Sequence, residues 1–362
     1  MNTSKDISLS DYIEEKAPEH WSIQYFYQNE PSVNFTKIPK TPEVEIHWYI
    51  ERYISEIRSH SLNPFYVAKA NDLKLIVFNN AGSGSLMDSD GVVFKDVSTS
   101  YTDEFKGMDF PKPERVNSKS VLLSVDAGSN YFHWMCHVLP KIHLLNESKI
   151  NWNEINKIIV PENRGDFVKE TLDTLNIPQD KILETKSGDH YIFDTLIVPC
   201  KPNRHIHMSR WSFDFLRDSF LKGSKHPPVK LFISRRDSSG RGVANKDEAK
   251  AVLNPLGFQE VFLEDYTVAQ QARLFNGATD IISSHGAGLT NLAFCEPGTK
   301  VIELFSPNYV HPLYWNFCNI LDFDYYYLMG EGKRPERGVD PHLKNEKISV
   351  NIEELKRIIS EN

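Results

Sequence analysis

The alternation of apolar, strand-like runs with helical segments constrains the fold of this sequence more than any other feature. Between residues 157 and 305, short runs rich in β-branched and aromatic residues alternate with segments that have the apolar spacing of amphipathic helices. The expected strands are residues 157–160, 191–198, 229–234, 258–263, 280–283 and 301–304, and the expected helices are residues 166–175, 207–221, 246–256, 268–278 and 289–294. Such alternation predicts an α/β fold with parallel, helix-covered sheets, which we interpret as two Rossmann-like lobes facing a cleft.

The length of the chain predicts two domains, because 362 residues are too many for one hydrophobic core. Residues 223–228 (GSKHPP) are the best linker candidate, since glycine and proline interrupt regular structure. The predicted division is an N-terminal lobe at 1–224 with an irregular extension, a C-terminal Rossmann-like lobe at 225–330, and a terminal loop and helix at 331–362 that pack back on the N-terminal lobe.

The sequence before residue 150 gives weaker patterns. Residues 1–45 are polar and contain several prolines, which is typical of a segment that wraps the surface. The further expectations are a helix at 47–57, β-like runs between 65 and 101 with a turn at 82–85, a loop at 105–118, a strand at 121–125 and a helix at 131–147, together with a last helix at 351–360.

Charge and composition exclude several classes of protein. The formal net charge of −8 argues against a nucleic-acid-binding protein with a strong positive field. Four scattered cysteines without a CxxC pair argue against a disulfide scaffold or a thiolate zinc site and fit a reducing compartment. No window approaches the roughly 20 apolar residues that span a bilayer. We therefore expect a cytoplasmic protein that is at most peripheral to a membrane.

The segment His285-Gly286-Ala287-Gly288 is the first candidate site. It follows an apolar strand and precedes a helical segment, so in an open α/β sheet it lies at the carboxyl edge, where ligands bind. Two glycines let the backbone approach a ligand, and a helix start offers free N–H groups to an anion. The pattern indicates a phosphate-bearing ligand. The alternative is a turn that needs glycine for its own geometry, with His285 packed in the core.

A second candidate site follows the strand at 229–234. Arg235, Arg236 and Arg241 lie within seven residues, and guanidinium groups pair well with phosphate oxygens. The alternative is a solvated basic loop paired with surface carboxylates. Glu303, at the end of a later strand, could accept hydrogen bonds from a ribose, or it could cap a helix or pair with an arginine.

A third candidate site lies on the predicted helix at 131–147. His133 and His137 share one helix face, a spacing that metalloenzymes use. No glutamate follows His133, so the HExxH pattern fails, and His143 is not on the same turn. His133 is the better candidate for a general base, with a hydrogen-bonded structural histidine as the alternative. Asp126 is a second candidate base, or a helix cap.

Four sequence blocks, taken in order, resemble glycosyltransferase family 61. They are NYFHW with LPK at 130–141, SRR with RGVANKDE at 234–248, VFLEDYTVAQQ at 261–271, and IISSHGAGLTNLAF with PGTKVIEL at 281–304. This family of inverting transferases contains plant xylosyl- and arabinosyltransferases, animal enzymes that add N-acetylglucosamine to proteins, and many bacterial relatives named for capsular polysaccharide synthesis. The resemblance spans roughly residues 120 to 305.

The resemblance implies a GT-B-like arrangement in which the C-terminal lobe binds the nucleotide-sugar and the N-terminal lobe serves the acceptor. Arg235, Arg236 and residues 285–288 would hold the diphosphate, and Glu303 would lie near the ribose or base. His133 would face the reacting sugar. The remaining residues expected at the donor are Arg241, Asn245, Glu248, Glu264 and Asn291. Lys141 and Lys246 depart from the family pattern, in which arginine and an acidic residue are usual.

The predicted function is transfer of a sugar, with inversion, from a nucleoside diphosphate donor to an acceptor hydroxyl. The expected donor is a UDP-sugar and the expected acceptor a glycan or glycolipid, in bacterial capsule or other surface polysaccharide synthesis, without a metal or other cofactor. Asp322-Phe323-Asp324 has the spelling of a DxD motif but fits a buried strand end better. Two alternatives stay open: a catalytically inactive nucleotide-sugar-binding partner of a polysaccharide assembly complex, and a metal hydrolase that uses His133 and His137.

Overall fold

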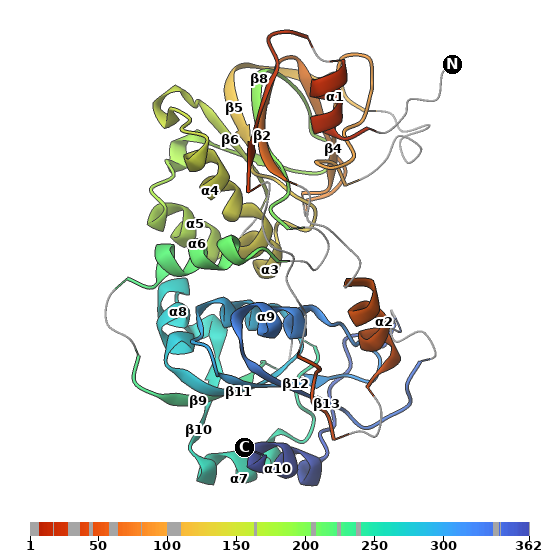
Figure 1. Cartoon of the computed structure of the whole chain (residues 1–362), viewed down its shortest axis with the longest axis vertical. Coiled ribbons are helices and arrows are strands. Elements are labelled where there is room, and N and C mark those ends of the chain that lie inside the picture. The colour runs from red at the N-terminus through yellow and green to blue at the C-terminus, as the bar shows by residue number, and fades with distance from the viewer. Residues whose placement is uncertain are drawn as a thin grey trace. The chain divides into compact units, whose positions relative to one another are not determined.

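The structure, a computed structural model of the chain, divides into two compact units (Figure 1). Unit 1 comprises Met1–Pro31 and Leu62–His205, and unit 2 comprises Ser32–Ser61 and Ile206–Asn362. The residues that the structure describes are 7–16, 18–27, 37–42, 46–57, 64–80, 82–99, 110–162, 165–203, 208–222, 226–236, 240–335, 340 and 342–361.

Unit 1 is built on a mixed sheet whose strand order, among the described residues, is β1-β2-β8-β5-β6-β7. Strands β8, β5, β6 and β7 run parallel, whereas β1 and β2 are antiparallel additions and the β3–β4 hairpin joins β8. The strands are β1 (Ser22–Phe26), β2 (Phe65–Ala70), β3 (Leu73–Val77), β4 (Gly84–Met87), β5 (Glu114–Leu122), β6 (Lys157–Pro161), β7 (Ile182–Thr185) and β8 (His190–Pro199). The helices are α1 (Leu9–Glu15), α3 (Tyr131–His133), the π-helix η2 (Trp134–Val138), α4 (Pro140–Glu147), η3 (Trp152–Glu154), α5 (Asp166–Thr174) and η4 (Gln179–Lys181).

The predicted helix at 131–147 is one continuous helical segment with a π-helical centre. Asn130 caps its start by accepting a hydrogen bond from the Phe132 amide at 2.9 Å. Pro140 has no N–H and its ring excludes the usual bond to the carbonyl of Cys136, so the helix widens before it. The Cys136 carbonyl instead accepts a hydrogen bond from Asn203 Nδ2 at 2.5 Å. The wider turn therefore leaves no unsatisfied carbonyl at Cys136.

Unit 2 is built on a parallel sheet with the order β10-β9-β11-β12-β13 among the described residues. Counted along the chain this is the order 2-1-3-4-5 of a doubly wound sheet. The strands are β9 (Val229–Ser234), β10 (Phe258–Phe262), β11 (Ala278–Ser284), β12 (Lys300–Phe305) and β13 (Asp324–Met329). The helices are α2 (Trp48–Ile57), α6 (Arg210–Phe220), α7 (Lys246–Leu253), η6 (Asn254–Leu256), η7 (Leu263–Asp265), α8 (Val268–Asn276), the 3₁₀-helix η8 (Ala287–Phe294), α9 (Leu313–Leu321) and α10 (Ile352–Ser360).

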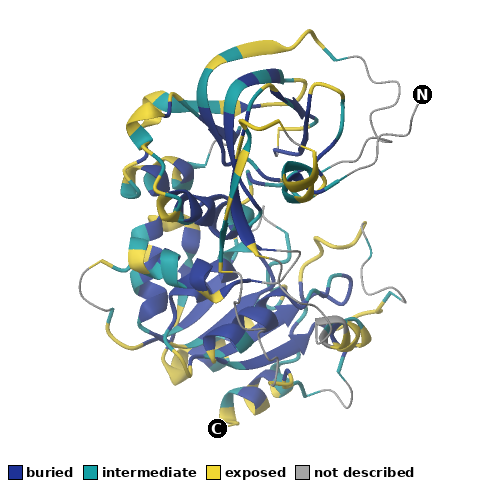
Figure 2. Cartoon of the chain, turned by 45° about the horizontal axis from the view of Figure 1, so that its top comes forward, coloured by how far each residue is buried: buried dark blue, intermediate teal, exposed yellow. Residues whose placement is uncertain are grey.

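Helices cover both faces of the unit 2 sheet. Figure 1 shows α7 and α10 on one side of it and α8 and α9 on the other. Under α7 and α10, Phe232, Ile282 and Ile302 of the three central strands pack with Leu253 and Leu355 of the helices. The strands β9, β11, β12 and β13 are accordingly mostly buried (Figure 2), whereas β10, at the edge of the sheet, is partly exposed. This burial on both faces explains why these strands appear in the sequence as continuous apolar runs instead of alternating patterns.

The structure confirms the predicted α/β class and corrects several elements. The predicted turn at 82–85 is correct for Gly82, where the chain turns with φ +93°, but Gly84 and Ser85 belong to β4. Gly84 lies so close to β3 that a Cβ there would be 2.6 Å from the Ile76 carbonyl oxygen. The predicted loop at 105–118 ends in β5, which starts at Glu114. The structure adds α1, β1, β7 and α9, which lack a distinct sequence pattern. Residues 105–109 of that loop, 223–225 of the proposed linker, and 336–339 and 341 of the predicted terminal loop lie outside the described residues.

The two units differ from the predicted domains at both boundaries. The division falls between residues 205 and 206, and not at 224, because α6 packs on the helices η8 and α8 of unit 2. Its Arg217 donates to the Cys295 carbonyl at 2.6 Å and pairs with Glu296 at 2.9 Å. Residues 331–362 belong to unit 2, where Lys300 Nζ binds the Ile358 carbonyl at the end of α10 at 2.6 Å. The segment 32–61 also joins unit 2.

Candidate functional site

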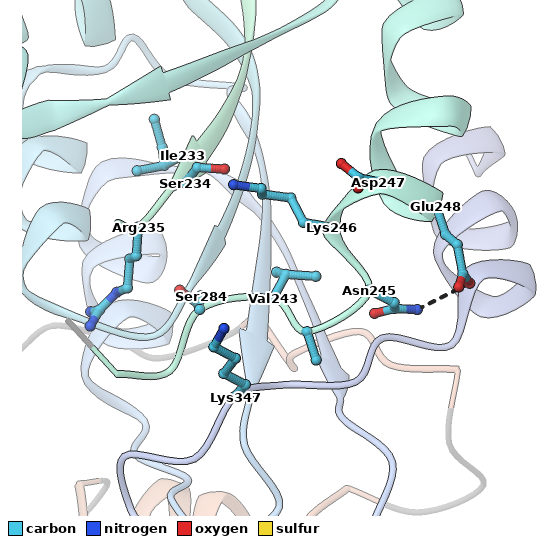
Figure 3. Close-up of a pocket in the computed structure, with 12 residues that line it drawn as sticks. Ile233, Ser234, Arg235, Val243, Asn245, Lys246, Asp247, Glu248, Ser284 and Lys347 are labelled. Carbon is cyan, nitrogen blue, oxygen red and sulfur yellow. Dashed lines mark hydrogen bonds between the residues drawn. The ribbon is translucent and has the colours of Figure 1, made fainter. Parts of the chain in front are cut away.

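A polar pocket of about 340 Å³ lies at the carboxyl edge of the unit 2 sheet (Figure 3). Strand β9 ends there at Ser234 and β11 at Ser284, and the two strands are neighbours whose connections lead to opposite sides of the sheet. This is the topological switch point, where doubly wound sheets bind ligands. We refer to it as the switch-point pocket. Its lining residues are Ile233, Ser234, Arg235, Gly242, Val243, Ala244, Asn245, Lys246, Asp247, Glu248, Ser284 and Lys347.

Arg235 connects the pocket to the joint after β11. Its guanidinium donates to the carbonyl oxygens of Gly240 at 3.1 Å and His285 at 3.2 Å. A Cβ at Gly286 would lie 1.6 Å from Arg235 NH2, so glycine is needed there to leave room for the guanidinium. The backbone of Gly286 is extended (φ 165°), which any residue adopts. Burial, and next the charge of Arg241, lower the pKa of Arg235 to about 10, so this environment disfavours its positive charge.

The other two candidate arginines do not line the switch-point pocket. Arg236 forms ion pairs with Glu264 at 3.0 Å and Asp265 at 2.5 Å, and its guanidinium lies over the Phe262 ring. Arg241 adopts a left-handed backbone conformation (φ 52°) and stacks on the Tyr309 ring at 4.8 Å. Its buried Nε has no hydrogen-bond partner among the described residues. Of the three arginines, only Arg235 reaches the pocket.

His285 and Glu303 form a buried hydrogen-bonded pair below the carboxyl edge. His285 Nδ1 lies 2.5 Å from Glu303 Oε1, and Tyr325 donates to Glu303 Oε2 at 2.6 Å. Burial raises the pKa of Glu303 to about 8 and lowers the pKa of His285 well below its usual range, so burial favours the neutral form of both groups. Glu303 is completely buried. A ribose, which the family resemblance places near Glu303, could reach it only by displacing these hydrogen bonds.

The rest of the joint after β11 has structural contacts. A Cβ at Gly288 would meet Leu263 Cδ1 at 2.7 Å, so this glycine also leaves room for a side chain. Ala287 begins the 3₁₀-helix η8. Asn291 is completely buried and its Nδ2 donates to Gln271 Oε1 at 2.7 Å. These contacts fasten η8 to α8. Ser284, the last residue of β11, lines the pocket, whereas residues 285–288 do not.

The N-terminus of α7 forms another wall of the pocket. Asn245 and Glu248, both expected at the donor, line it, and Asn245 Nδ2 lies 3.5 Å from Glu248 Oε2. Lys246 Nζ lies 3.6 Å from Glu260 Oε1, and the other carboxylate oxygen of Glu260 pairs with Lys250. Lys347, from the segment before α10, completes the lining and is not among the residues predicted from the sequence. Only its tertiary position reveals it, because no local pattern marks it.

The candidate bases His133 and Asp126 belong to unit 1. His133 Nδ1 and His137 Nδ1 lie 3.1 Å apart in a shared hydrogen bond on the π-helical segment. Burial lowers the pKa of both imidazoles, and Asp126 partly opposes this at His133. Asp126 accepts a hydrogen bond from Ser83 Oγ and does not cap the helix, since Asn130 does. A neutral imidazole at pH 7 has the protonation state that a general base requires.

No group of three or more His, Cys, Asp or Glu side chains among the described residues is arranged to hold a metal ion. Asp322 and Asp324 of the DxD-like spelling lie before and at the start of β13, and pair with Lys37 at 2.5 Å and Lys40 at 2.7 Å. Both carboxylates therefore lie at the amino ends of the parallel strands, whereas the switch-point pocket lies at their carboxyl ends. Within the described part of the chain, every helix is too short or too polar to cross a membrane.

Two comparisons with known proteins bear on this site. Residues 131–302 match the family model described as Glycosyltransferase 61. A protein of rice (Oryza sativa subsp. japonica) named Beta-1,2-xylosyltransferase RCN11 is 29% identical over 119 residues, which cover 28% of this chain and 22% of the rice protein. The family match begins at α3, beside His133, and ends within β12, so it includes the π-helical segment and most of the switch-point pocket.

Proposed function

Since residues 131–302 match the Glycosyltransferase 61 family model, we propose that the chain transfers a sugar from a nucleoside diphosphate donor, with UDP-sugars as the first class to test, to an acceptor hydroxyl with inversion. The observation that carries this proposal is the polar pocket at the switch point of the unit 2 sheet, with Arg235 in its wall. A glycan or glycolipid is the proposed acceptor.

The chemistry of the switch-point pocket supports a ligand with both phosphates and hydroxyls. Arg235 can donate to phosphate oxygens, and its lowered pKa means that an anion would offset a charge that the protein environment disfavours. The first turn of α7 also faces the pocket, and the side chain of its N-cap residue, Asn245, makes no capping hydrogen bond. The backbone amides in the first turn of α7 can therefore bind an anion. Asp247 and Glu248 can accept hydrogen bonds from ribose or sugar hydroxyls.

These groups also suit the reaction. As the bond between the anomeric carbon and the diphosphate oxygen breaks, negative charge grows on the leaving diphosphate. A fixed guanidinium and helix amides stabilise that charge more in the transition state than in the ground state, which accelerates the reaction. The acceptor hydroxyl loses its proton to a base, and its oxygen forms the new bond on the opposite face of the sugar.

We propose His133 as that base. To accept a proton at Nε2, neutral His133 must carry its own proton on Nδ1 and donate it to His137 Nδ1, 3.1 Å away. The proposal requires that His133 reach the sugar held by unit 2, in the GT-B-like arrangement that the family resemblance implies. Asp126 is the second candidate. The shared hydrogen bond occupies one ring nitrogen of each histidine, which disfavours a metal hydrolase built on this pair.

The test is to incubate the purified protein with UDP-sugars in the presence of EDTA and to measure donor hydrolysis and transfer. Activity that survives chelation and falls about 10- to 150-fold in Arg235→Ala supports the proposal, since charge-assisted hydrogen bonds to Arg contribute about 1.5–3 kcal/mol. Arg236→Ala is the matched control, because Arg236 lies outside the pocket. Nucleotide binding without turnover would indicate an inactive partner protein, and activity that requires stoichiometric zinc would contradict the mechanism.

A further inference from the structure

The segment that precedes α10 pairs with residues 241–244, which follow Arg235 and Arg236 along the wall of the switch-point pocket. Val243 and Ile348 form a parallel β-bridge. The Ala244 amide donates to the Ile348 carbonyl at 2.7 Å, and the Ile348 amide donates to the Gly242 carbonyl at 2.8 Å. The Arg241 amide donates to the Asn345 carbonyl at 3.0 Å. We refer to residues 345–350 as the tail segment. It lies outside the region that matches the family model.

The side chain of Asn245 fixes the end of the tail segment. Its Nδ2 donates to the Val350 carbonyl at 2.9 Å, and its Oδ1 accepts from the Val350 amide at 2.9 Å. One side-chain amide thus satisfies both backbone groups of Val350, as a neighbouring strand would. Ile348 and Val350 are buried in the same core as Leu253 of α7. The tail segment is therefore held in a defined register beside the pocket.

This register places Lys347 in the pocket. In an extended segment successive side chains point to opposite sides, so the burial of Ile348 directs Lys347 away from the core. Figure 3 shows the amino ends of Lys347 and Lys246 directed toward the middle of the pocket, and Arg235 lines the side at which β9 ends. Three cationic side chains from three separate parts of the chain thus line one cavity of about 340 Å³.

We propose that Lys347 is a ligand of the donor's diphosphate and that the tail segment completes the donor pocket. This inference rests on the proposed function. A lysine ammonium offers three donors and a compact charge, and it binds phosphate oxygens without the planar geometry that arginine requires. Asp247 and Glu248, which line the same pocket, repel an anion, and Lys347 offsets that repulsion. The tail segment acts as a fixed wall that carries one of the phosphate-binding charges.

The experiment begins with calorimetric titration of the unaltered protein with UDP, GDP and ADP, and continues with the nucleotide that binds most tightly. Lys347→Gln removes the charge and keeps a polar side chain of similar length. We expect about a tenfold rise in Kd and a weaker dependence of Kd on salt concentration, because one cation–phosphate contact is lost. Lys347→Arg should restore most of the affinity.

Lys344→Gln is the matched control. Lys344 lies three residues before Lys347 in the same exposed stretch, so this substitution removes the same formal charge. Lys344 does not line the pocket. Its affinity should equal that of the unaltered protein, which separates a direct contact from a general effect of net charge. Wild-type affinity in Lys347→Gln would overturn this inference and leave the proposed function intact. Failure of the unaltered protein to bind any of the three nucleotides would overturn both.

Discussion

Replacement of Gly286 by alanine tests whether this glycine exists to make room for Arg235. A Cβ at residue 286 would lie 1.6 Å from Arg235 NH2, whereas ordinary contact begins at 3.4 Å. The difference, 3.4 minus 1.6, means that the guanidinium must move by about 2 Å, more than its hydrogen bonds to Gly240 and His285 can tolerate. The backbone at Gly286 is extended, so strain in φ adds no further cost.

The expected cost of Gly286→Ala is about 1–3 kcal/mol of unfolding free energy, the usual range for overpacking. Nucleotide affinity should also fall by about 10- to 100-fold, since the displaced Arg235 can no longer meet the phosphate. The decisive measurement is a double-mutant cycle with Arg235→Ala. With the guanidinium removed, the added methyl group has space, and the effect of Gly286→Ala on both stability and binding should largely disappear.

Gly288→Ala is the control, since its Cβ would meet the flexible end of Leu263 and not Arg235. It should lower stability and leave the effect of Arg235→Ala unchanged. If the losses from Gly286→Ala and Arg235→Ala simply add in the double variant, the two residues act independently and the steric reasoning is wrong.

Three further predictions concern other parts of the molecule. With the pKa of Glu303 at about 8 in the folded chain against 4.5 unfolded, the unfolded state releases this proton first, so the contribution of Glu303 to stability falls as pH rises from 4.5 to 8. Glu303→Gln should remove this contribution, at most about 1.4 kcal/mol per pH unit, so the stability difference between the variant and the unaltered protein should change with pH in urea titrations between pH 6.5 and 8. The comparison cancels the opposing slopes of His285 and Lys141, and a difference that does not vary with pH would contradict the assignment. Asn245→Ala should lose about 1–3 kcal/mol and increase amide exchange at Ile348 and Val350, and unchanged protection there would show that the side chain does not hold the tail segment. Lys141, buried and with a pKa of about 7 against 10.5 unfolded, should make stability rise between pH 7 and 10.5, and in Lys141→Met that rise should vanish, as thermal unfolding across this range would measure.

The strand and helix pattern of unit 2 could be predicted because each element has a strong local signal. Strand β9 was predicted at its observed bounds, 229–234, and α8 begins as expected at Val268 behind a Thr267 capping box. The antiparallel part of unit 1 was harder to predict, since β1 and β4 are short and the register of β1 depends on a distant partner, as in the pairing of Ser22 with Lys69. The helix α9 is buried almost all round, so it lacks the polar face that marks a surface helix.

For the candidate site as well, some features could be predicted from the sequence and others only from the tertiary structure. The sequence by itself determined that the chain has parallel α/β sheets, that a glycine-containing joint and an arginine loop follow two of the strands, and that the blocks resemble one family. Tertiary structure decided which of these residues share a cavity: Arg235 reaches it, Arg236 turns to Glu264, and Glu303 is sealed against His285. It also brought Lys347 to the pocket from about 100 residues beyond the arginine loop. The physical reason is that local patterns report the periodicity of burial, whereas the partner of a charged side chain depends on strand order and register, which no local stretch of sequence contains.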